Sequence, residues 1–416
     1  MSPGTSAPED WASTPVFAPE TVHVIASAEE ALEVAREFAA EIRPGAAERD
    51  AQGTRPWEQI RSLRGSGLLG ITVPAEYGGA DVDIVTLVEI FRIISAADPA
   101  VGQIPQNHFS HLENVHRLGT PEQRRFFYTK ILGGALFGNA LSERGTAGGL
   151  RNLKTRLEPK GPGEYVLSGR KYYSTGALFA QWIPVTCLDD DGRLQVAHVP
   201  RDAPGVEVVD DWDVMGQRGT ASGTTVLDRV TVPEEHVIPI WRYAEGPSIR
   251  LAFGQVMHIA IDVGIAEEAL ADTVAYVGTR SRAWHAAVPP IARAGDDPHI
   301  IRRVGELTVQ VKGAHALMLR AAEALDRCGD SPTEEDAREA SLAVATAKAA
   351  ASAAAVQVAS DMFALTGASA TDERWNLHRH WRNARTHTLH DPEVWKYHHI
   401  GDWVLNRRLP PDGALF

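Results

Sequence analysis

The sequence predicts an α+β chain in which a helical region, a compact β domain and a bundle of long helices follow one another. Residues 28–137 carry apolar side chains at three- and four-residue steps, the spacing of amphipathic helices. Residues 138–243 contain short apolar or alternating stretches separated by Gly, Asp and Pro, which is typical of strands joined by turns. Residues 244–416 return to helical periodicity over three long stretches, so we expect a final helical bundle.

Helix start signals support the first region. Ser27 precedes its first apolar-periodic stretch as an N-cap residue. Further on, Thr120, Pro121 and Gln123 form the signature of a capping box with proline in the first turn. Residues 1–27 lack the basic start and apolar run of a signal peptide and are rich in Pro, Ser, Thr and acidic residues. We therefore expect them to form a flexible N-terminal arm.

The β domain and the bundle are each built from a few well-marked stretches. Strands are expected at residues 164–176, 182–188, 193–200, 205–212 and 224–233. Long helices are expected at residues 250–284, 300–328 and 334–365. The third helix is unusually rich in alanine and follows Ser331 and Glu334, which we interpret as part of its capping box. Helices this long pack against partners within the chain or across a subunit interface.

Composition narrows the classes of function. The formal net charge of −13 excludes a general nucleic-acid binder, because phosphate recognition needs a basic surface. The two cysteines, Cys187 and Cys328, can form neither a disulfide framework nor a four-cysteine zinc site, and they suit a reducing cytoplasm. No stretch approaches about 18 consecutive apolar residues, so no membrane span is expected.

Two short motifs match known patterns in the wrong context. Residues 65–70 read G-x-G-x-x-G, but a helix precedes them and an extended segment is expected after them, the reverse of a dinucleotide-binding turn. We interpret these glycines as a helix C-terminal turn. Residues 168–171 read S-x-x-K without any companion motif, and we interpret them as a hairpin turn.

The C-terminal part of the chain is rich in histidine. Its imidazole side chains are His378, His380, His387, His390, His398 and His399. His387 and His390 are three residues apart and share a helical face if the segment is helical. Together with Asp391, such a group could bind a metal ion, or line a pocket that donates protons. It could equally consist of surface or interface histidines, and spacing alone leaves the three interpretations open.

Four segments resemble acyl-CoA dehydrogenases in their order along the chain. They are GLLGITVPAEYGG (67–79), GEYVLSGRKYYSTGA (163–177), DRVTVP (228–233) and WRNARTHTLHDP (381–392). The resemblance implies a helical N-terminal domain, a middle β-barrel or sandwich domain and a C-terminal four-helix bundle, assembled as a homotetramer. A flavin would lie between the β domain and the bundle, with its phosphate end reaching a neighbouring subunit.

The chain resembles the monooxygenase branch of that superfamily more strongly than it resembles the dehydrogenases. This branch includes dibenzothiophene monooxygenase and the sulfur-acquisition oxidoreductases linked to alkyl sulfone use. The matching segments are residues 94–109, 138–143, 210–224 and 382–398. The resemblance implies a two-component enzyme that takes reduced FMN from a separate NAD(P)H-dependent flavin reductase. Oxygen would add at flavin C4a to give a hydroperoxide, which would oxygenate a small organosulfur compound. The chain itself shows no nicotinamide site.

Other activities remain open on the sequence. One alternative is an N-oxygenase of the same branch, and another is an FAD-dependent acyl-CoA dehydrogenase. Many dehydrogenases carry Tyr-Glu-Gly where this chain has His390, Asp391 and Pro392, and that glutamate removes the substrate α-proton. Asp391 keeps a carboxylate on a shorter side chain, so dehydrogenation is disfavoured. A third alternative is a non-enzymatic metal-binding or interaction protein that uses the histidine-rich segment.

The resemblance also assigns individual residues. It implies catalytic roles for Asn139, Thr175, His387 and His390. It implies flavin contacts for Asn139, Tyr173, Thr175, Trp212, Ser222, Gly367 and Asp391, and for Arg282 at a neighbour's FMN phosphate. It places Gln103, Asn107 and His108 on the substrate side, and it implies no metal. Gln103 and Asn107 stand where dibenzothiophene monooxygenase has histidine and tyrosine, and neither can relay a proton as those residues can. A smaller, more polar substrate than a fused aromatic is expected.

Overall fold

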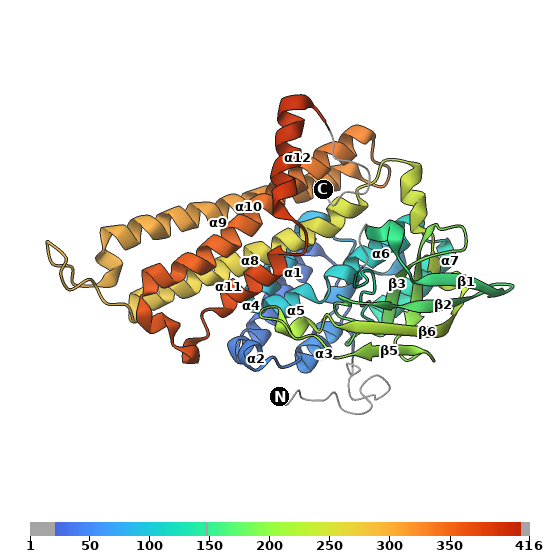
Figure 1. Cartoon of the computed structure of the whole chain (residues 1–416), viewed down its shortest axis with the longest axis horizontal. Helices are drawn as coiled ribbons and strands as arrows, with labels where there is room; N and C mark the ends of the chain where they lie inside the picture. The colour runs from blue at the N-terminus through green and yellow to red at the C-terminus, as the bar shows by residue number, and fades with distance from the viewer. Residues whose placement is uncertain (1–20, 146–148, 409–416) are drawn as a thin grey trace.

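The computed structural model describes residues 21–145 and 149–408, and in it helices, one sheet and long helices succeed one another as predicted. The sheet lies at one end of the molecule, and the long helices α9 and α10 form an arm at the other (Figure 1). The N-terminal helices are α1 (Ala28–Ile42), α2 (Ala46–Gln52), α3 (Trp57–Gly65), α4 (Ile84–Ala97), α5 (Pro99–Gln103), α6 (Gln106–Leu118) and α7 (Pro121–Leu132).

The expected caps of the N-terminal helices are confirmed. The Ser27 hydroxyl accepts a hydrogen bond from the Glu30 backbone N–H at 3.2 Å. At α7, the Thr120 hydroxyl accepts from the Gln123 N–H at 3.2 Å, and the Gln123 side chain accepts from the Thr120 N–H at 2.9 Å. The glycines of the G-x-G-x-x-G match do end a helix, since α3 stops at Gly65 and Gly67 is left-handed with φ +84°.

The segment that follows is not extended, and that part of the prediction is wrong. It turns through two short 3₁₀ helices, Leu68–Gly70 and Ala75–Tyr77. The turn is tight because Gly79 lies against the backbone of Val73, where an added Cβ would stand 2.1 Å from the Val73 carbonyl oxygen. Glycine at this position therefore allows a folded-back loop where hydrophobic content alone favours a strand.

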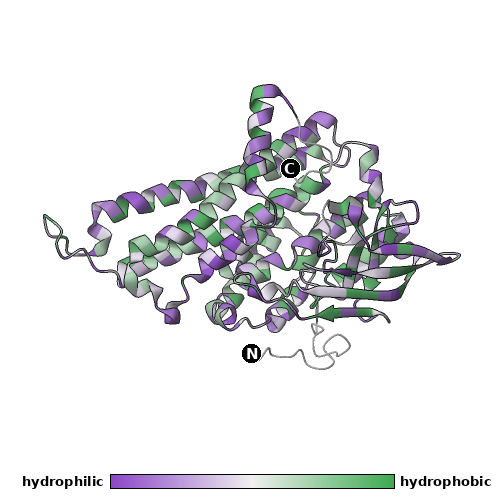
Figure 2. Cartoon of the chain, viewed as in Figure 1, coloured by the Kyte–Doolittle hydropathy of each residue, from purple (hydrophilic) through white to green (hydrophobic). Residues whose placement is uncertain are grey.

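The middle region forms a seven-stranded sheet in the order β5-β6-β2-β1-β3-β4-β7. Its strands are β1 (Arg156–Gly161), β2 (Glu164–Lys171), β3 (Trp182–Leu188), β4 (Leu194–Pro200), β5 (Val206–Val209), β6 (Thr224–Pro233) and β7 (Val237–Ile238). Neighbours pair antiparallel except β1 with β3, and hydrophilic and hydrophobic residues alternate along several strands (Figure 2). Five strands lie in the expected stretches, whereas β1 and β7 were not predicted.

The S-x-x-K match was predicted as a hairpin turn, and this is wrong because residues 168–171 lie inside β2. The register between β2 and β6 shifts between Leu167 and Gly169, which is a β-bulge. Gly169 is required there because a Cβ would lie 2.3 Å from the Thr155 hydroxyl. A glycine that permits close approach of two strands thus resembles, in sequence, a glycine that permits a turn.

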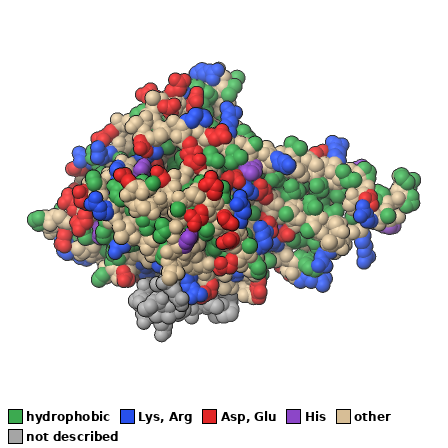
Figure 3. Space-filling view, turned by 180° about the vertical axis from the view of Figure 1, so that it is seen from behind, with side chains coloured by type: hydrophobic (Ala, Val, Ile, Leu, Met, Phe, Trp, Pro, Cys, Tyr) green, Lys and Arg blue, Asp and Glu red, His purple; other side chains and the backbone are tan. Residues whose placement is uncertain are grey.

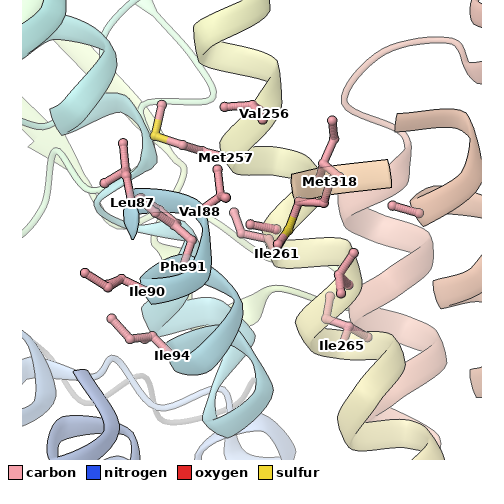
Figure 4. Packing of buried hydrophobic residues seen from close by; sticks show 14 of the residues in the cluster. Leu87, Val88, Ile90, Phe91, Ile94, Val256, Met257, Ile261, Ile265 and Met318 are labelled. Atoms are coloured by element: carbon pink, nitrogen blue, oxygen red, sulfur yellow. The ribbon is translucent and has the colours of Figure 1, made fainter. Parts of the chain in front are cut away.

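The C-terminal helices are α8 (Arg250–Thr279), α9 (Pro298–Cys328), α10 (Glu334–Thr366), α11 (Arg379–Thr388) and α12 (Glu393–Asn406). Helix α4 packs its apolar face against α8, and Met318 of α9 joins the same core (Figure 4). The capping box of α10 is Thr333 with Asp336, so the expected assignment to Ser331 and Glu334 is wrong. The box begins two residues later because Thr333 has the extended backbone of an N-cap residue.

Helix α10 is rich in alanine along most of its length. Within the described part of the chain it alone is long and apolar enough to cross a bilayer by length and composition, and 61% of its most apolar window is buried inside the fold. Many of its alanines are fully buried, as the sequence predicted for close helix packing: Ala340, Ala345, Ala347, Ala351 and Ala355. Burial of this kind is expected of the central helix of a bundle.

Helix α11 holds the three regions together. The guanidinium of Arg382 pairs with Asp50 of α2, donates to the Met215 carbonyl oxygen at 2.6 Å and reaches the Asn376 side chain at 3.0 Å. Beside it, Gly216 contacts the backbone of α11 so closely that a Cβ would lie 2.0 Å from the Arg382 carbonyl oxygen. The β domain and the bundle are therefore in main-chain contact at this point.

Candidate active site

Three buried hydroxyl groups form a chain on the β-domain side. The Thr175 hydroxyl lies 2.8 Å from that of Ser222, which lies 2.7 Å from that of Thr220. Thr220 in turn donates to the Gln217 carbonyl oxygen at 2.9 Å. The chain carries no charge, and each hydroxyl can donate one hydrogen bond and accept others. It brings together two predicted residues, Thr175 and Ser222, that are far apart in sequence.

An exposed aromatic ring lies next to this chain. Tyr173 has φ +57°, a backbone conformation that is unusual for a non-glycine residue, and the residue is 56% exposed. Asn139 donates to the Tyr173 carbonyl oxygen at 3.3 Å, and the buried ring of Trp212 lies 5.9 Å from the Tyr173 ring. Trp212 is fixed by a hydrogen bond from its indole N–H to Gln217 at 3.0 Å. Predicted flavin-side residues therefore meet around one open aromatic face.

The bundle side of the site is charged. Asp262 of α8 is fully buried and accepts from Lys348 of α10 at 2.8 Å, from Ser352 at 3.1 Å and from His387 of α11 at 2.5 Å. Burial by itself would raise the pKa of Asp262, but Lys348 and His387 outweigh it and lower the pKa to about 2. For His387, burial is the larger effect and lowers its pKa. The carboxylate is ionised and the imidazole is neutral.

His258 joins the two predicted histidines. Its Nδ1 lies 2.9 Å from Nε2 of His387, and its ring lies 4.2 Å, centroid to centroid, from the ring of His390. His390 contacts Asp391 at 3.2 Å, and Asp391 pairs with the buried Lys396 of α12 at 3.1 Å. Burial would raise the pKa of Asp391, but His390 and nearby lysines keep it well below its ordinary value. The predicted pair is thus part of a larger array.

The other members of this array are marked in the sequence by polar residues in apolar helices. His258 and Asp262 are four residues apart within the otherwise apolar stretch 256–266 of α8, so they share a face of a buried helix. Lys348 is similarly isolated in the alanine-rich α10. A buried helix carries a titratable side chain only when a partner compensates it, so these positions mark a polar contact inside the bundle.

A hydrogen bond connects the two sides. The Gln217 backbone N–H donates to the Asn383 side chain at 2.6 Å. Asn383 is one turn before His387 on α11, so both lie on the same face of that helix. Because Gln217 also accepts from Thr220, bonded contacts lead from the hydroxyl chain to the helix that carries the histidines.

The third wall comes from α5 and α6. Gln106 donates to the Gly254 carbonyl oxygen at 3.0 Å, which sets α6 against α8 one turn before His258. Gln103 and Asn107 lie half-buried on this wall, and the Gln103 side-chain oxygen is buried without a hydrogen-bond partner among the described residues. His108 is different, because one ring nitrogen accepts from the Phe137 N–H and the other lies 2.9 Å from the Leu69 carbonyl oxygen. Both nitrogens of His108 are thus committed to the backbone.

His111, which the sequence did not single out, lies one turn beyond Asn107. Its Nε2 is 3.5 Å from the Asn139 side-chain oxygen, and its Nδ1 is buried without a partner among the residues described. Burial lowers the pKa of His111 to about 3, so the ring is neutral. The wall therefore contains a neutral imidazole one helical turn beyond Asn107.

Two predicted flavin residues lie elsewhere in the chain. Arg282 and Gly367 are exposed at the far end of the bundle, where the Ser281 hydroxyl donates to the Thr366 carbonyl oxygen at 3.2 Å. Arg282 lies three residues beyond the end of α8, and the part of α8 from His258 to Thr279 alone spans about 32 Å at 1.5 Å per residue. Within one chain, Arg282 is therefore not brought to the site.

Comparisons with known proteins agree with this arrangement. The chain matches the N-terminal, middle and C-terminal domains of acyl-CoA dehydrogenases over residues 26–135, 138–230 and 256–392. Dibenzothiophene monooxygenase of Rhodococcus erythropolis is 34% identical over 95% of this chain and 99% of its own length. This chain belongs to the monooxygenase branch of the acyl-CoA dehydrogenase superfamily. It is a flavin-dependent enzyme of that branch, with the superfamily's fold.

Other similar proteins are named for a flavin or for a sulfur-containing substrate. The probable FMNH2-dependent monooxygenase SfnC of Pseudomonas putida is 30% identical over 91% of this chain and 96% of its own length. Methanesulfinate monooxygenase MsuC of Pseudomonas fluorescens is 32% identical, with a TM-score of 0.84 over 91% of this chain and 98% of that one. The FMN-bound TdsC of Paenibacillus sp. A11-2, 29% identical, gives a TM-score of 0.87 with the same coverage.

The residues of this chain fit a flavin of the monooxygenase branch. Buried polar atoms without hydrogen-bond partners among the described residues occur in the β domain and on α11: the Ser174 hydroxyl, both amide atoms of Gln217 and the Thr386 hydroxyl. Such atoms are rare in folded proteins unless a ligand or water satisfies them. A flavin ring has a polar edge with donors and acceptors and two flat apolar faces, which suits these atoms and the exposed ring of Tyr173.

The carboxylates and histidines of the bundle side are paired with one another. Asp391 is held ionised by His390 and Lys396, which makes it a weak base for removing a carbon-bound proton. Across residues 21–145 and 149–408, no group of three or more His, Cys, Asp or Glu side chains is placed to bind a metal ion. The histidines of the array are bonded to one another and to carboxylates instead.

Proposed function

We propose that the chain is the oxygenase component of a two-component FMN monooxygenase that oxygenates a small, anionic organosulfur compound such as an alkanesulfinate. The observation that carries the proposal is a site with a neutral hydroxyl chain on one side, a histidine array on the other and a polar third wall. Reduced FMN, when bound, would supply the electrons that activate O2. A separate NAD(P)H-dependent reductase would supply the reduced FMN, in keeping with the FMNH2 dependence named for the P. putida relative.

The residues of this chain would have distinct tasks. Tyr173 and Trp212 would cover the flavin, while Thr175, Ser222 and Asn139 would hold its polar edge with fixed dipoles. On the opposite side, His387 and His390 would hold or move protons, because an imidazole nitrogen can donate or accept a hydrogen. Apolar walls from α4 and α8 would limit the entry of water.

An unpaired cation near the third wall favours an anionic substrate. Arg250 begins α8 and is half-buried, and no described residue forms a hydrogen bond or ion pair with its guanidinium. The guanidinium lies over the ring of Tyr243, 5.6 Å from its centroid. Burial lowers the pKa of Arg250, and its charge contributes to the lowered pKa of His111. A guanidinium matches the planar, two-oxygen head of a sulfinate or carboxylate.

Polar atoms on α6 extend the same wall. Asn107, His111 and Asn114 recur at four- and three-residue steps and share one face of the helix. The Asn114 side-chain oxygen, like Nδ1 of His111, is buried without a partner among the described residues. A fused aromatic hydrocarbon would leave these atoms unsatisfied, whereas a small oxyanion and its bound water would satisfy them.

The proposal is tested by turnover with reduced FMN from a flavin reductase and NADH under ¹⁸O2. Three probes are compared, namely methanesulfinate, neutral dimethyl sulfone and dibenzothiophene. We expect one ¹⁸O atom in the methanesulfonate product, and little product from dibenzothiophene. Arg250→Met should raise KM for methanesulfinate by about tenfold or more, the loss of one charge-assisted contact. Preference for dibenzothiophene, or no oxygen incorporation from any probe, would contradict the proposal.

We also propose that the chain forms a homotetramer. Apolar side chains are exposed on α12, where Trp395 is 55% and Leu405 82% exposed, and in the loop that carries Arg282. Apolar side chains also occur along the helical arm, on a surface where Asp, Glu, Lys and Arg are otherwise intermingled (Figure 3). Assembly would cover such surface and would bring Arg282 to the FMN phosphate of another subunit. Light scattering should give four chains per particle, and a monomer would contradict this.

A further inference from the structure

Seven side chains form a continuous row between the core of the bundle and the site. In order of contact they are Lys348, Asp262, His387, His258, His390, Asp391 and Lys396. A lysine–aspartate pair lies at each end, and three imidazoles lie between. The inner end is fully buried at Asp262, whereas the His390 side chain is 41% exposed. The row is therefore buried at both ends and reaches the surface at His390.

The hydrogen bonds at the inner end fix where the protons are. Asp262 is ionised and can only accept, so Nδ1 of His387 carries the hydrogen of their 2.5 Å contact. Because His387 is neutral, its Nε2 has no hydrogen and must accept. The 2.9 Å contact is then donated by Nδ1 of His258. Burial, followed by the neighbouring histidines, keeps the pKa of His258 well below its ordinary value, so this ring is also neutral.

One ring nitrogen is left over. In neutral His258 the hydrogen is on Nδ1, so Nε2 has a free lone pair, and no described residue donates a hydrogen bond to it. A bare nitrogen backed by a second imidazole and a carboxylate is the arrangement of a proton acceptor. The groups that face it from the packed elements are Asp262 on α8, Lys348 on α10, His387 on α11, His390 with Asp391, and Lys396 on α12.

We propose that His258 is a third proton-handling histidine of this site, and that Asp262 is a positioning residue that makes its Nε2 an acceptor. The inference rests on the proposed function, since it names which nitrogen takes up a proton during turnover. Over one cycle the sulfur compound, O2 and reduced FMN give the oxygenated product, FMN and water. Two hydrogens of reduced FMN therefore end in the water molecule. One of them requires a temporary proton acceptor in the site.

The proton transfer balances within the row. A proton arrives at Nε2 of His258 as the hydrogen on its Nδ1 passes to Nε2 of His387. His258 is then again neutral, with its hydrogen on Nε2, and His387 is an imidazolium that keeps its Nδ1–H on Asp262. The positive charge rests beside the buried carboxylate, where Coulomb attraction is strongest. Reversal of the same two transfers returns the proton to the site.

The first test reads proton positions in the flavin-free protein, by nuclear magnetic resonance of the protein labelled with ¹⁵N in its histidine rings. His258 and His387 should each show one protonated Nδ1 and one bare Nε2 at pH 7. The Asp262–His387 hydrogen should resonate far downfield, and Asp262→Asn should abolish that signal. A protonated Nε2 on His258 would overturn the inference, whatever the activity of the enzyme. This measurement also stands if wild type oxygenates no probe, which would defeat only the proposed function.

The second test compares variants during turnover. His258→Gln keeps an N–H donor for His387 but cannot take up a proton, so kcat should fall about 100-fold, a usual effect of losing a general base. KM for the sulfur compound and Kd for FMN should change less than about threefold, because binding contacts remain. The matched control is His315→Gln on α9. The His315 imidazole lies outside the row and pairs with Glu89 at a distance of 2.6 Å. The kcat of His315→Gln should equal that of wild type.

A merely structural role for His258 would give a different pattern. His258→Gln would then lower the melting temperature and FMN affinity together with kcat, and the dependence of kcat on pH would keep its wild-type shape. If His258 accepts a proton, the acidic limb of that pH profile should disappear in His258→Gln and persist in His315→Gln. An unchanged acidic limb in His258→Gln would overturn the assignment.

Discussion

Each side of the site contains a group of buried polar side chains, but the two groups differ in chemistry. On the β-domain side, Thr175, Ser222 and Thr220 form a chain of neutral hydroxyls. On the bundle side, imidazoles lie between buried ions such as Asp262 and Lys348. A neutral hydroxyl keeps its dipole at every pH, so it can hold a cofactor edge. A titratable row changes charge with pH, so it can move protons but depends on every partner.

The difference in chemistry between the two sides should have its largest effect on the free energy of unfolding. Asp262→Asn leaves the ammonium of Lys348 buried without its counter-charge, so it should cost about 3–5 kcal/mol of unfolding free energy. Chemical denaturation of the flavin-free protein measures this. The double variant Asp262→Leu with Lys348→Met removes both charges and should recover most of the loss. A cost below about 1 kcal/mol for Asp262→Asn would mean that water reaches the pair.

The two sides should also differ in how they respond to a decrease in pH. The pKa values of His258 and His387 are lowered by burial, so the unfolded chain binds protons at a higher pH than the fold does. The unfolding free energy should therefore keep its full value above about pH 6.5. Below that pH it should decrease by about 1.4 kcal/mol per pH unit for each such histidine. The pKa of Asp262, about 2, is also lowered, but its contribution is lost only below about pH 4.

The dependence of unfolding free energy on pH can be compared in two variants, one from each side of the site. Between pH 6.5 and 4, His258→Gln should flatten the dependence of unfolding free energy on pH by about 1.4 kcal/mol per pH unit. Thr175→Val should leave the slope unchanged, because no charge is involved. Equal slopes for His258→Gln and wild type would mean that His258 is already protonated in the fold.

A smaller effect is expected from the hydroxyl chain. Thr175→Val keeps the shape but removes a hydrogen-bonding group, so FMN affinity should fall by about 1–2 kcal/mol, or about tenfold in Kd. Fluorescence titration of FMN measures it. Thr175→Ser keeps the hydroxyl and should bind like wild type. If Thr175→Val and Thr175→Ser bind FMN equally, the hydroxyl makes no contact with the cofactor.

The smallest effect should come from the exposed phenol. The hydroxyl of Tyr173 lies on an exposed ring, so Tyr173→Phe should change Kd for FMN less than about twofold. Tyr173→Ala removes the aromatic face and should weaken FMN binding by about 1 kcal/mol or more. An effect of Tyr173→Phe as large as that of Tyr173→Ala would show that the phenol, not the face, is recognised.

Much of the fold followed from local patterns in the sequence. The caps at Ser27 and Thr120 and five of the strands were predictable because each depends on neighbouring residues. The strand β1 was not, since Arg156–Gly161 contains proline and has a single buried side chain. It is a strand because β2 and β3 flank it, and that pairing is a property of the whole sheet.

The site divides in the same way. His387 and His390 are close in sequence and were predicted, whereas His258 and Lys348 are 90 residues apart and meet only in the packed bundle. His111 was missed because a histidine on a helix next to other polar residues resembles an ordinary exposed face. His108 was predicted on the substrate side, but its two bonds to backbone atoms could be recognised only from the fold.

Gly216 has a consequence for how this enzyme could acquire new substrates. Its main chain touches that of Arg382, so the separation of the two site halves is fixed by backbone rather than by side chains. Even alanine at this position would push the β domain off α11. Divergence of specificity should therefore spare this contact and fall on α6, where Asn107 and His111 can change without altering the distance from cofactor to histidines. In this chain the spacing between the β domain and α11 is thus constrained by the backbone, whereas the side chains on α6 are free to vary.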